Sequence, residues 1–167
     1  MTLRFRRPVE ADHPTIVRLV DEWWAGQRVR DQLPRLWFRH FSGTSWIAET
    51  GDGDLAGFVI GFVSPDRPER AVLHMVGVDP NRRRRGVGRS LYERFSDDAA
   101  RLGAHQIEAA CWPANRAAIG FLQALGLVAD SGPGSQSLYG SPAFADYDGP
   151  GEDRAIYVAR LAEVPTR

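Results

Sequence analysis

Lysine is missing from this chain: all 21 basic residues are arginines, and 21 aspartates and glutamates balance them to a formal net charge of zero. A neutral chain of this kind does not present the broad basic surface that binding to nucleic-acid phosphates requires. We therefore expect no nucleic-acid partner. Because arginine is the general cation of this protein, a short run of arginines carries less information than the residues that surround it.

Cysteine is also scarce, with Cys111 as the single example. One cysteine excludes an internal disulfide and agrees with a reducing compartment. Its neighbours Ala109, Ala110 and Trp112 favour a small buried hydrophobic residue over a nucleophile. We expect no metal site and no metal cofactor.

Long apolar runs are absent, and none approaches the roughly 20 residues that a helix needs to span a bilayer. Residues 1–7 alternate with charges and contain no apolar signal-peptide core. We expect no membrane partner and a cytoplasmic location. The 43% hydrophobic and 25% charged residues are typical of a soluble globular protein, and 167 residues suit a single domain spanning 1–167.

Apolar periodicity predicts a mixed α/β domain. The order of strands and helices suggests an antiparallel first half, followed by a strand–helix–strand crossover that places residues 106–112 parallel to residues 71–78. The last strand is expected to close the sheet. The predicted strands are 3–6, 45–49, 55–63, 71–78, 106–112, 137–139 and 155–159, and the predicted helices are 12–24, 31–41, 87–102 and 115–126.

The most informative segment is residues 79–90, where an apolar strand passes through four arginines and two glycines into an amphipathic helix. Gly86 and Gly88 remove Cβ atoms that would keep a ligand from the backbone. The first N–H groups of the helix lack partners and lie at the positive end of its dipole, which suits an anion. The alternatives are a solvated basic turn before a surface helix, and arginines that contact nucleic-acid phosphates.

The pattern Arg83-x-x-Gly86-x-Gly88, entered from Val76-x-Val78 and followed by a helix, resembles the acyl-CoA pyrophosphate loop of the GNAT superfamily of N-acyltransferases. It differs from a dinucleotide-binding Gly-x-Gly-x-x-Gly motif and from a P-loop, which needs Lys-Ser/Thr. The resemblance implies a GNAT-like single domain, with a mixed, largely antiparallel sheet of about six or seven strands and helices on both faces.

A second segment supports the same resemblance. Asn115, Ala118, Phe121 and Gly126 match the family signature Asn-x-x-Ala-x-x-Phe-Tyr-x-x-x-Gly-Phe on a short helix. Leu122 stands where the family often has tyrosine, and Leu127 replaces the usual aromatic residue. The departure at Leu122 removes the phenol that would protonate the departing thiolate. A thiol with a reference pKa of about 8.5 leaves tolerably without help, and Tyr139 or Tyr92 are alternative donors.

The resemblance implies transfer of an acetyl group from acetyl-CoA, as co-substrate, to the amine of a small molecule by direct attack in a ternary complex. The pyrophosphate would be held by the amides of Arg84 to Arg89 and by the side chains of Arg83 and Arg84. Val76 and Val78 would pair their backbones with the pantetheine arm. Asn115 would either bond that arm or cap its helix. The implied binding residues are Val76, Gly77, Val78, Arg83, Arg84, Arg85, Gly86, Val87, Gly88, Arg89, Ser90 and Asn115.

Gly77 is an isolated glycine within a strand, which predicts a β-bulge or a close backbone approach. A bulge there would turn an N–H group toward the thioester oxygen and stabilise the oxyanion. An amine acceptor arrives protonated, so a base is also required. We choose His74 on the same strand, acting directly or through water, although a strand histidine is often structural. Glu49 and Glu108 are the rivals.

The acceptor site is the least defined part of the sequence. Trp23, Trp24 and Trp37 pack the core or line an acceptor pocket. The irregular segment 131–153 is acidic near its end, through Asp146, Asp148, Glu152 and Asp153. It either borders the acceptor and favours a cationic amine, or is a solvated loop.

Three functions remain open on this evidence: the small-molecule acetyltransferase, a catalytically weak acyl-CoA-binding sensor or interaction module, and an acetyltransferase for protein N-termini or lysines. An open groove would favour the last of these. Relatives often pair through exposed strands or loops, which also leaves a homodimer open.

Overall fold

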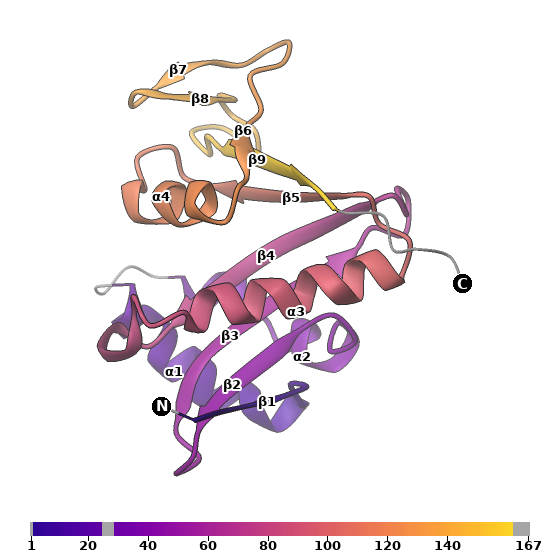
Figure 1. The fold of residues 1–167 in the computed structure, drawn as a ribbon. Helices are drawn as coiled ribbons and strands as arrows, with labels where there is room; N and C mark the ends of the chain where they lie inside the picture. Colours follow the sequence, from indigo (N-terminus) through magenta and orange to yellow (C-terminus); the bar gives the residue numbers. More distant parts are fainter. Residues whose placement is uncertain (1, 25–28, 162–167) are drawn as a thin grey trace.

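The computed structural model describes residues 2–24 and 29–161. In this part of the chain seven strands form one sheet in the order β1-β2-β3-β4-β5-β9-β6 (Figure 1). All neighbours are antiparallel except β4 and β5, which are parallel as predicted. The strands are β1 Leu3–Arg6, β2 Trp46–Thr50, β3 Leu55–Val63, β4 Arg70–Val78, β5 Gln106–Cys111, β6 Val128–Ala129 and β9 Ala155–Arg160.

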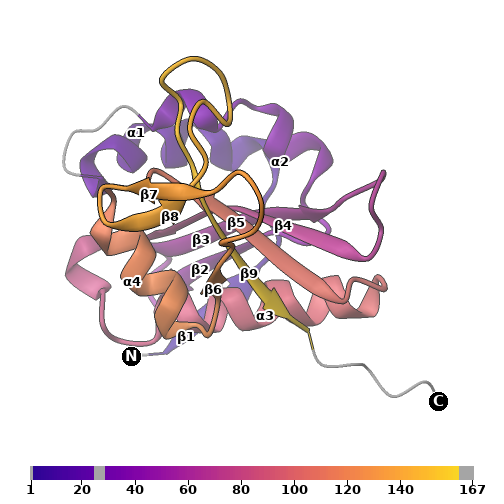
Figure 2. The same ribbon diagram turned by 90° about the horizontal axis from the view of Figure 1, so that it is seen from above.

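Helices cover both faces of this sheet, which confirms the predicted class of fold (Figure 2). One apolar cluster joins the sheet to α3 and α4, through residues such as Phe95 and Leu122, and a second joins it to α1 and α2, through residues such as Val20 and Phe38. The helices are α1 His13–Trp23, α2 Leu36–His40, α3 Val87–Arg101 and α4 Arg116–Ala124, with 3-10 turns η1 Glu10–Asp12, η2 Arg30–Gln32 and η3 Pro80–Arg82.

The ends of α3 and α4 follow from local chemistry, as the sequence predicts. Asn115 accepts a hydrogen bond from the backbone N–H of Ala118 through Oδ1 (3.0 Å), so it is the N-cap of α4. Gly103 and Gly126 follow the last turns of α3 and α4 with φ of 92° each. This left-handed conformation is one that glycine adopts without a Cβ penalty.

The single helix predicted for residues 31–41 is wrong. The structure instead has η2, then an extended Leu33 (φ −121°, ψ 58°), then the short α2. Pro34 explains the break, because a proline ring clashes with a helical conformation of the preceding residue. The break leaves the carbonyl of Gln32 outside any helix, where it meets a side chain from β4.

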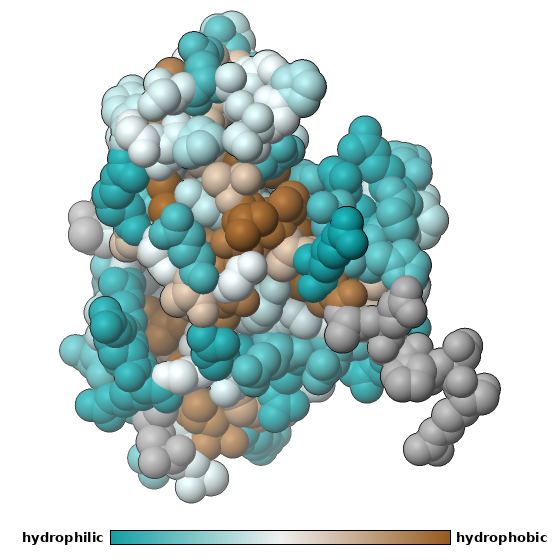
Figure 3. Space-filling view, turned by 45° about the horizontal axis from the view of Figure 1, so that its top comes forward, coloured by the Kyte–Doolittle hydropathy of each residue, from teal (hydrophilic) through white to brown (hydrophobic). Residues whose placement is uncertain are grey.

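The C-terminal third departs from a simple meander. The predicted strand at 137–139 is β7 Gln136–Leu138, which pairs with β8 Ser141–Ala143 in a separate two-stranded sheet above the main one (Figure 1). The last strand, β9, lies between β5 and β6 and not at the edge. No helix among the described residues has the length and apolarity to cross a membrane. On the face in Figure 3, apolar surface is interrupted by polar side chains.

A buried carboxylate ties α3 to the first strands. Asp98 is 6% exposed and accepts hydrogen bonds from Trp46 Nε1 (2.7 Å), from both terminal nitrogens of Arg7 (2.5 and 3.1 Å) and from Arg101 (2.5 Å). The Arg7 guanidinium also lies over the Trp46 ring, 3.7 Å from its centroid. Burial raises the pKa of Asp98, but these donors outweigh it, so the pKa lies below its usual value.

We predict that Asp98→Asn destabilises the fold by about 1–3 kcal/mol at neutral pH, because buried donors lose a charged acceptor. The folded-state pKa of Asp98 is depressed, so its contribution is complete above the unfolded value of 3.8 and is lost as pH falls through the folded value. Denaturant unfolding should therefore show a gap between wild type and variant that narrows in acid. Exposed Asp97→Asn is the control, and an equal effect of both substitutions would contradict this account.

Candidate functional site

The parallel strands β4 and β5 stay paired only along part of their length. Their register runs from Arg70 opposite Gln106 to Leu73 opposite Ala109, and beyond this point β5 pairs with β9 alone. Figure 1 shows the two strands diverging toward the end at which α3 begins. The second half of β4 therefore has one open edge.

Val76 and Val78 direct their backbones to this open edge. The N–H of Asp79 donates to Ala56 O (3.0 Å) near β3, and a Cβ on Gly57 would lie 2.8 Å from Gly77 O, so the backbones of Gly77 and Asp79 face β3. Because backbone groups alternate along a strand, those of Val76 and Val78 face the opposite side. An extended ligand can pair there as an added strand would.

The bulge predicted at Gly77 is wrong. Gly77 pairs regularly with Phe58, and the register shift falls between Ile60 and Gly61, where His74 is the extra residue of β4. The missing Cβ of Gly77 has a packing reason instead, because it would lie 2.4 Å from the Phe58 ring. Since its N–H faces β3, Gly77 is not placed to donate to a ligand at the open edge.

The loop before α3 presents a row of amides. The first helical bond runs from Ser90 N–H to Gly86 O (2.9 Å), and among the described residues no acceptor is found for the N–H groups of Arg84 to Arg89. Arg84 (φ 61°) and Gly86 (φ 82°) are both left-handed. Such alternation curls successive N–H groups into a concave anion site, and the dipole of α3 adds to it. A Cβ on Gly86 would meet nothing within 4 Å, so this side of the loop is open.

The arginine run divides between structural and free side chains. Arg83 donates to Trp23 O (2.5 Å) and Val78 O (3.3 Å), and it therefore joins the loop to the end of α1. Arg89 donates to Ala124 O (2.7 Å) at the end of α4. Arg84 and Arg85 are exposed and bond to no other described residue. Of Arg83 and Arg84, the predicted pair of side-chain ligands, only Arg84 is thus uncommitted.

Gly88 serves packing, contrary to the expectation that both glycines clear space for a ligand. A Cβ there would lie 2.9 Å from the Phe121 ring and 3.4 Å from Val78. The absence of a side chain lets α3 approach α4 and the end of β4. The two glycines therefore have different reasons: Gly86 permits the turn, and Gly88 permits the contact that holds the loop beside the open strand edge.

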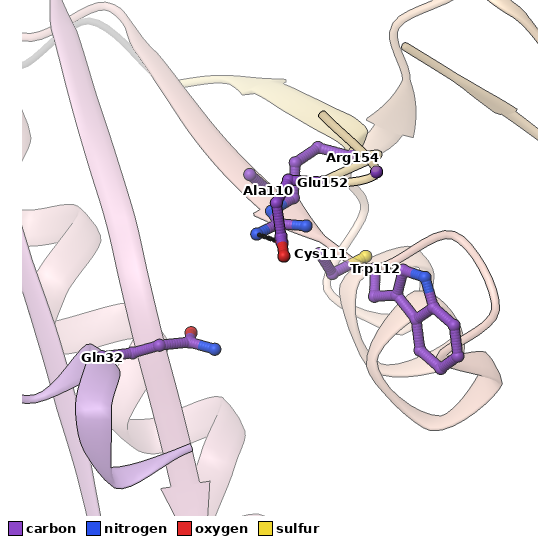
Figure 4. Close-up of a pocket in the computed structure, with 7 residues that line it drawn as sticks. Gln32, Ala110, Cys111, Trp112, Glu152 and Arg154 are labelled. Atoms are coloured by element: carbon purple, nitrogen blue, oxygen red, sulfur yellow. Dashed lines mark hydrogen bonds and ion pairs between the residues drawn. The ribbon is translucent and has the colours of Figure 1, made fainter. Parts of the chain in front are cut away.

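A cleft of about 400 Å³ lies where β5 leaves β4. One wall is Gln32 of η2, and the opposite wall carries Glu152 and Arg154 from the segment before β9 (Figure 4). The floor comes from Ala110 and Cys111 of β5, with Trp112, Gly151 and the remaining wall residues completing the lining. Burial raises the pKa of Cys111 to about 11, so its thiol stays protonated and is a poor nucleophile.

His74 lies behind the Gln32 wall. Its ring stacks on Trp37 (centroids 4.1 Å apart), and its Nε2 lies 2.7 Å from Gln32 O. A carbonyl only accepts, so Nε2 carries the proton of neutral His74 and Nδ1 is left as an acceptor. Burial lowers its pKa from 6.5, against a weaker effect of the Gln32 bond, so the neutral form dominates near pH ~7. The lining of the cleft, within the described residues, does not include His74.

Asp21 fixes the position of η2. This buried carboxylate on α1 accepts from the backbone N–H groups of Val29 and Arg30 (2.9 Å each), and it bonds Arg30 Nε. Burial raises the pKa of Asp21, but the donors from Arg30 and Val29 lower it further, so the group is ionised. Asp21 thereby holds the turn whose last residue, Gln32, both lines the cleft and bonds His74.

The rival bases and proton donors occupy distinct places. Glu49 accepts from Arg6 (2.7 Å) and Glu108 from Arg70 (2.5 Å), so each is already in an ion pair. Leu122 is buried, 6% exposed, in the core beneath α4. Tyr92 is 9% exposed within the same core, and burial raises its pKa. Tyr139 is 59% exposed, and its ring contacts Trp112 of the cleft at 5.8 Å between centroids.

The acidic segment reaches the cleft through a single residue, Glu152. Asp146 and Asp153 bond loop backbone, with Asp146 Oδ1 accepting from Gly151 N–H and Asp153 Oδ1 from Asp146 N–H. Trp23 is core, and Trp37 supports His74, so the tryptophan of the cleft is Trp112. Sequence reasoning missed Gln32 and Arg154. Pro34 signalled the first, since it ends η2, whereas Arg154 has no local signal.

In residues 2–24 and 29–161, no group of three or more histidine, cysteine, aspartate or glutamate side chains could hold a metal ion. The site thus consists of backbone amides, an open strand edge, a cleft with paired charges, and a neutral histidine beside it.

Comparison with known proteins places this geometry in context. The model of the acetyltransferase (GNAT) family matches residues 11–127. An L-2,4-diaminobutyric acid acetyltransferase of Nocardia farcinica is 34% identical over 115 residues, 69% of this chain and 59% of the relative. One of Streptomyces avermitilis is 30% identical over 69% of this chain and 65% of the relative. The chain thus aligns with about three-fifths of the length of these curated relatives.

Solved structures share the fold. A diaminobutyrate acetyltransferase from Paenibacillus lautus, in complex with L-2,4-diaminobutyric acid and coenzyme A, is 22% identical with a TM-score of 0.66, covering 98% of this chain and 99% of that one. A GNAT-superfamily phosphinothricin acetyltransferase from Sinorhizobium meliloti, in complex with acetyl-CoA, is 19% identical with a TM-score of 0.70, covering 100% of this chain and 93% of that one.

Gly88→Ala should destabilise the protein by about 1–3 kcal/mol, because the new methyl group overpacks the contact with Phe121. Gly120→Ala is the matched control: Gly120 lies in α4, and a Cβ there meets nothing within 4 Å. Alanine in an exposed helix should leave stability unchanged or raise it by about 0.5–1 kcal/mol. Thermal unfolding measures both, and equal melting temperatures would show that Gly88 has no packing role.

Proposed function

Because the chain belongs to the acetyltransferase (GNAT) family, we propose that it transfers the acetyl group of acetyl-CoA to an amine of a small molecule. The observation that carries this proposal is the pairing of two unfilled backbone sites: the amides of Arg84 to Arg89 and the open edge at Val76 and Val78. The first suits a pyrophosphate, and the second suits an extended amide-containing arm.

The residues present fit acetyl-CoA. The pyrophosphate would accept from the loop amides, with the free Arg84 and Arg85 side chains beside it. Gly86, whose Cβ position is open, lets the anion reach the backbone. Asn115 uses Oδ1 for the helix cap, and its side-chain N–H groups can donate to the arm. Val87, Gly88 and Ser90 hold the first turn of α3 in place.

The chemistry is nucleophilic attack by a neutral amine on the thioester carbonyl, with formation of an amide and departure of the thiol. The amine must first lose a proton, and His74 is neutral and can accept one at Nδ1. Since Gln32 separates His74 from the cleft, the proton would travel through a water. Gly77 is not placed to donate to an oxyanion at the open edge, and the N–H of Val76 takes that role in our proposal.

A leucine at position 122 leaves the departing thiol without the tyrosine that is common in the family. Of the two other tyrosines considered, Tyr139 borders the cleft through Trp112 and Tyr92 is enclosed in the core. We propose that the thiolate leaves with assistance from Tyr139 or from solvent. Leu122 is also the feature that favours the alternative function, an acyl-CoA-binding module with weak or no turnover.

The acceptor we propose is a small diamino carboxylic acid. The named relatives act on L-2,4-diaminobutyric acid, and a cleft of about 400 Å³ is of small-molecule size. The cleft is bounded on opposite sides by Gln32 and by Glu152 with Arg154, which favours a compact acceptor over a protein chain.

Thiol release from acetyl-CoA with a panel of small amines tests this function, and we expect turnover with 2,4-diaminobutyrate. Gly86→Asn should raise the dissociation constant of acetyl-CoA about tenfold or more, since it adds a side chain over the amides while asparagine tolerates a left-handed backbone. Gly53→Asn is the control, because Gly53 also has a positive φ (87°) and open space, on the β2–β3 hairpin. Binding without turnover across the panel would favour the binding module, and equal affinity of both variants would reject the loop site.

His74→Gln should lower kcat roughly 100-fold or more, as expected on removal of a general base. The pKa of His74 lies below 6.5, so wild-type kcat should rise with pH through that acid range and then level, and the variant should lack this limb. Exposed His40→Gln is the control. A variant with unchanged kcat and the same pH profile would make His74 structural.

A further inference from the structure

The cleft contains opposite charges held at fixed positions. Arg154 Nε lies 2.7 Å from Asp148 Oδ2, a terminal nitrogen lies 2.9 Å from Glu152 Oε2, and the other donates to Asp153 O (2.7 Å). Figure 4 shows Glu152 and Arg154 together on the wall that faces Gln32. Asp148 does not line the cleft, so the ligand meets one cation and one anion.

Arg154 retains unused donors. A guanidinium has five N–H groups, and the three bonds above occupy three of them. The Arg154 side chain is 21% exposed and anchored at three points, whereas that of Glu152 is 59% exposed. Arg154 therefore offers a pre-positioned face to a carboxylate, which matches guanidinium geometry. Glu152 offers acceptor oxygens to an ammonium group.

We propose that Glu152 and Arg154 form the recognition site for the α-ammonium and carboxylate of an amino acid acceptor, a proposal that rests on the function proposed above. Arg154 binds the carboxylate, and Glu152 binds the ammonium. A zwitterion placed against this pair leaves every charge with a partner, so none is buried alone. The second amine of the acceptor then lies toward Gln32 and the open edge of β4.

The pair selects by what an acceptor lacks. An amine without a carboxylate leaves Arg154 without its new partner, and an amine without the α-ammonium leaves its own carboxylate beside Glu152. Sites built to bind a polar group discriminate strongly against analogues without it, because buried polar groups then stay unpaired. The cleft should therefore distinguish diamino acids from simple diamines and from ω-amino acids.

Three acceptors separate the two contacts: 2,4-diaminobutyrate, 1,3-diaminopropane, which lacks the carboxylate, and 4-aminobutyrate, which lacks the α-ammonium. Wild type should have its highest kcat/KM on the first. Glu152→Gln should raise KM about tenfold for the two diamines and less than about twofold for 4-aminobutyrate. Arg154→Lys should raise KM by a similar factor for the two carboxylates and leave 1,3-diaminopropane nearly unchanged.

Asp148→Asn is the matched control, since Asp148 bonds Arg154 but lies outside the cleft lining. If Glu152→Gln and Arg154→Lys reduce all three acceptors equally, or if Asp148→Asn reproduces their pattern, the pair only supports the loop and our proposal is wrong. Turnover of none by wild type would instead reject acetyl transfer itself. Calorimetric titration of 2,4-diaminobutyrate into wild type and Glu152→Gln, with coenzyme A present, then decides the recognition site, and equal affinities or no heat would overturn it.

Discussion

The parting of β4 from β5 is the constraint on which the other features of the site depend. Hydrogen bonding between the two strands stops at Leu73 and Ala109, which leaves the backbone of Val76 and Val78 without a strand partner. The same parting opens the cleft over Ala110 and Cys111. One departure from regular pairing therefore creates both a linear site along β4 and a concave site beside β5.

The charges of the molecule are organised around this opening. Arginines elsewhere are committed to structure, as Arg7 is to Asp98 and Arg30 is to Asp21. Around the site, exposed Arg84 and Arg85 flank unpaired amides, while Arg154 is held by carboxylates with donors to spare. A chain of zero net charge can in this way present a positive site for phosphates and a mixed site for a zwitterion.

Local patterns predicted local features well, and long-range packing explains the failures. The helix over Val87–Arg101, its glycine cap and the Asn115 cap follow from side chains within one or two turns. Gly77 and Gly88 were misread because their reasons lie in the Phe58 and Phe121 rings, distant in sequence. His74 was found from chemistry alone, but its bulge, its Trp37 stack and its Gln32 bond need the tertiary structure. Arg154 could not be found, because its place in the cleft depends on how the chain returns to β9.

The most direct measurement of the central claim is the response of single backbone amides to coenzyme A, recorded by NMR on isotopically labelled protein. If unpaired N–H groups and the open strand edge hold the ligand, the amide resonances of Arg84 to Arg89, Val76 and Val78 should shift on titration, while that of Gly77, which faces β3, should move far less. Saturable binding that leaves the loop amides unmoved, or the absence of binding by folded protein, would contradict the account.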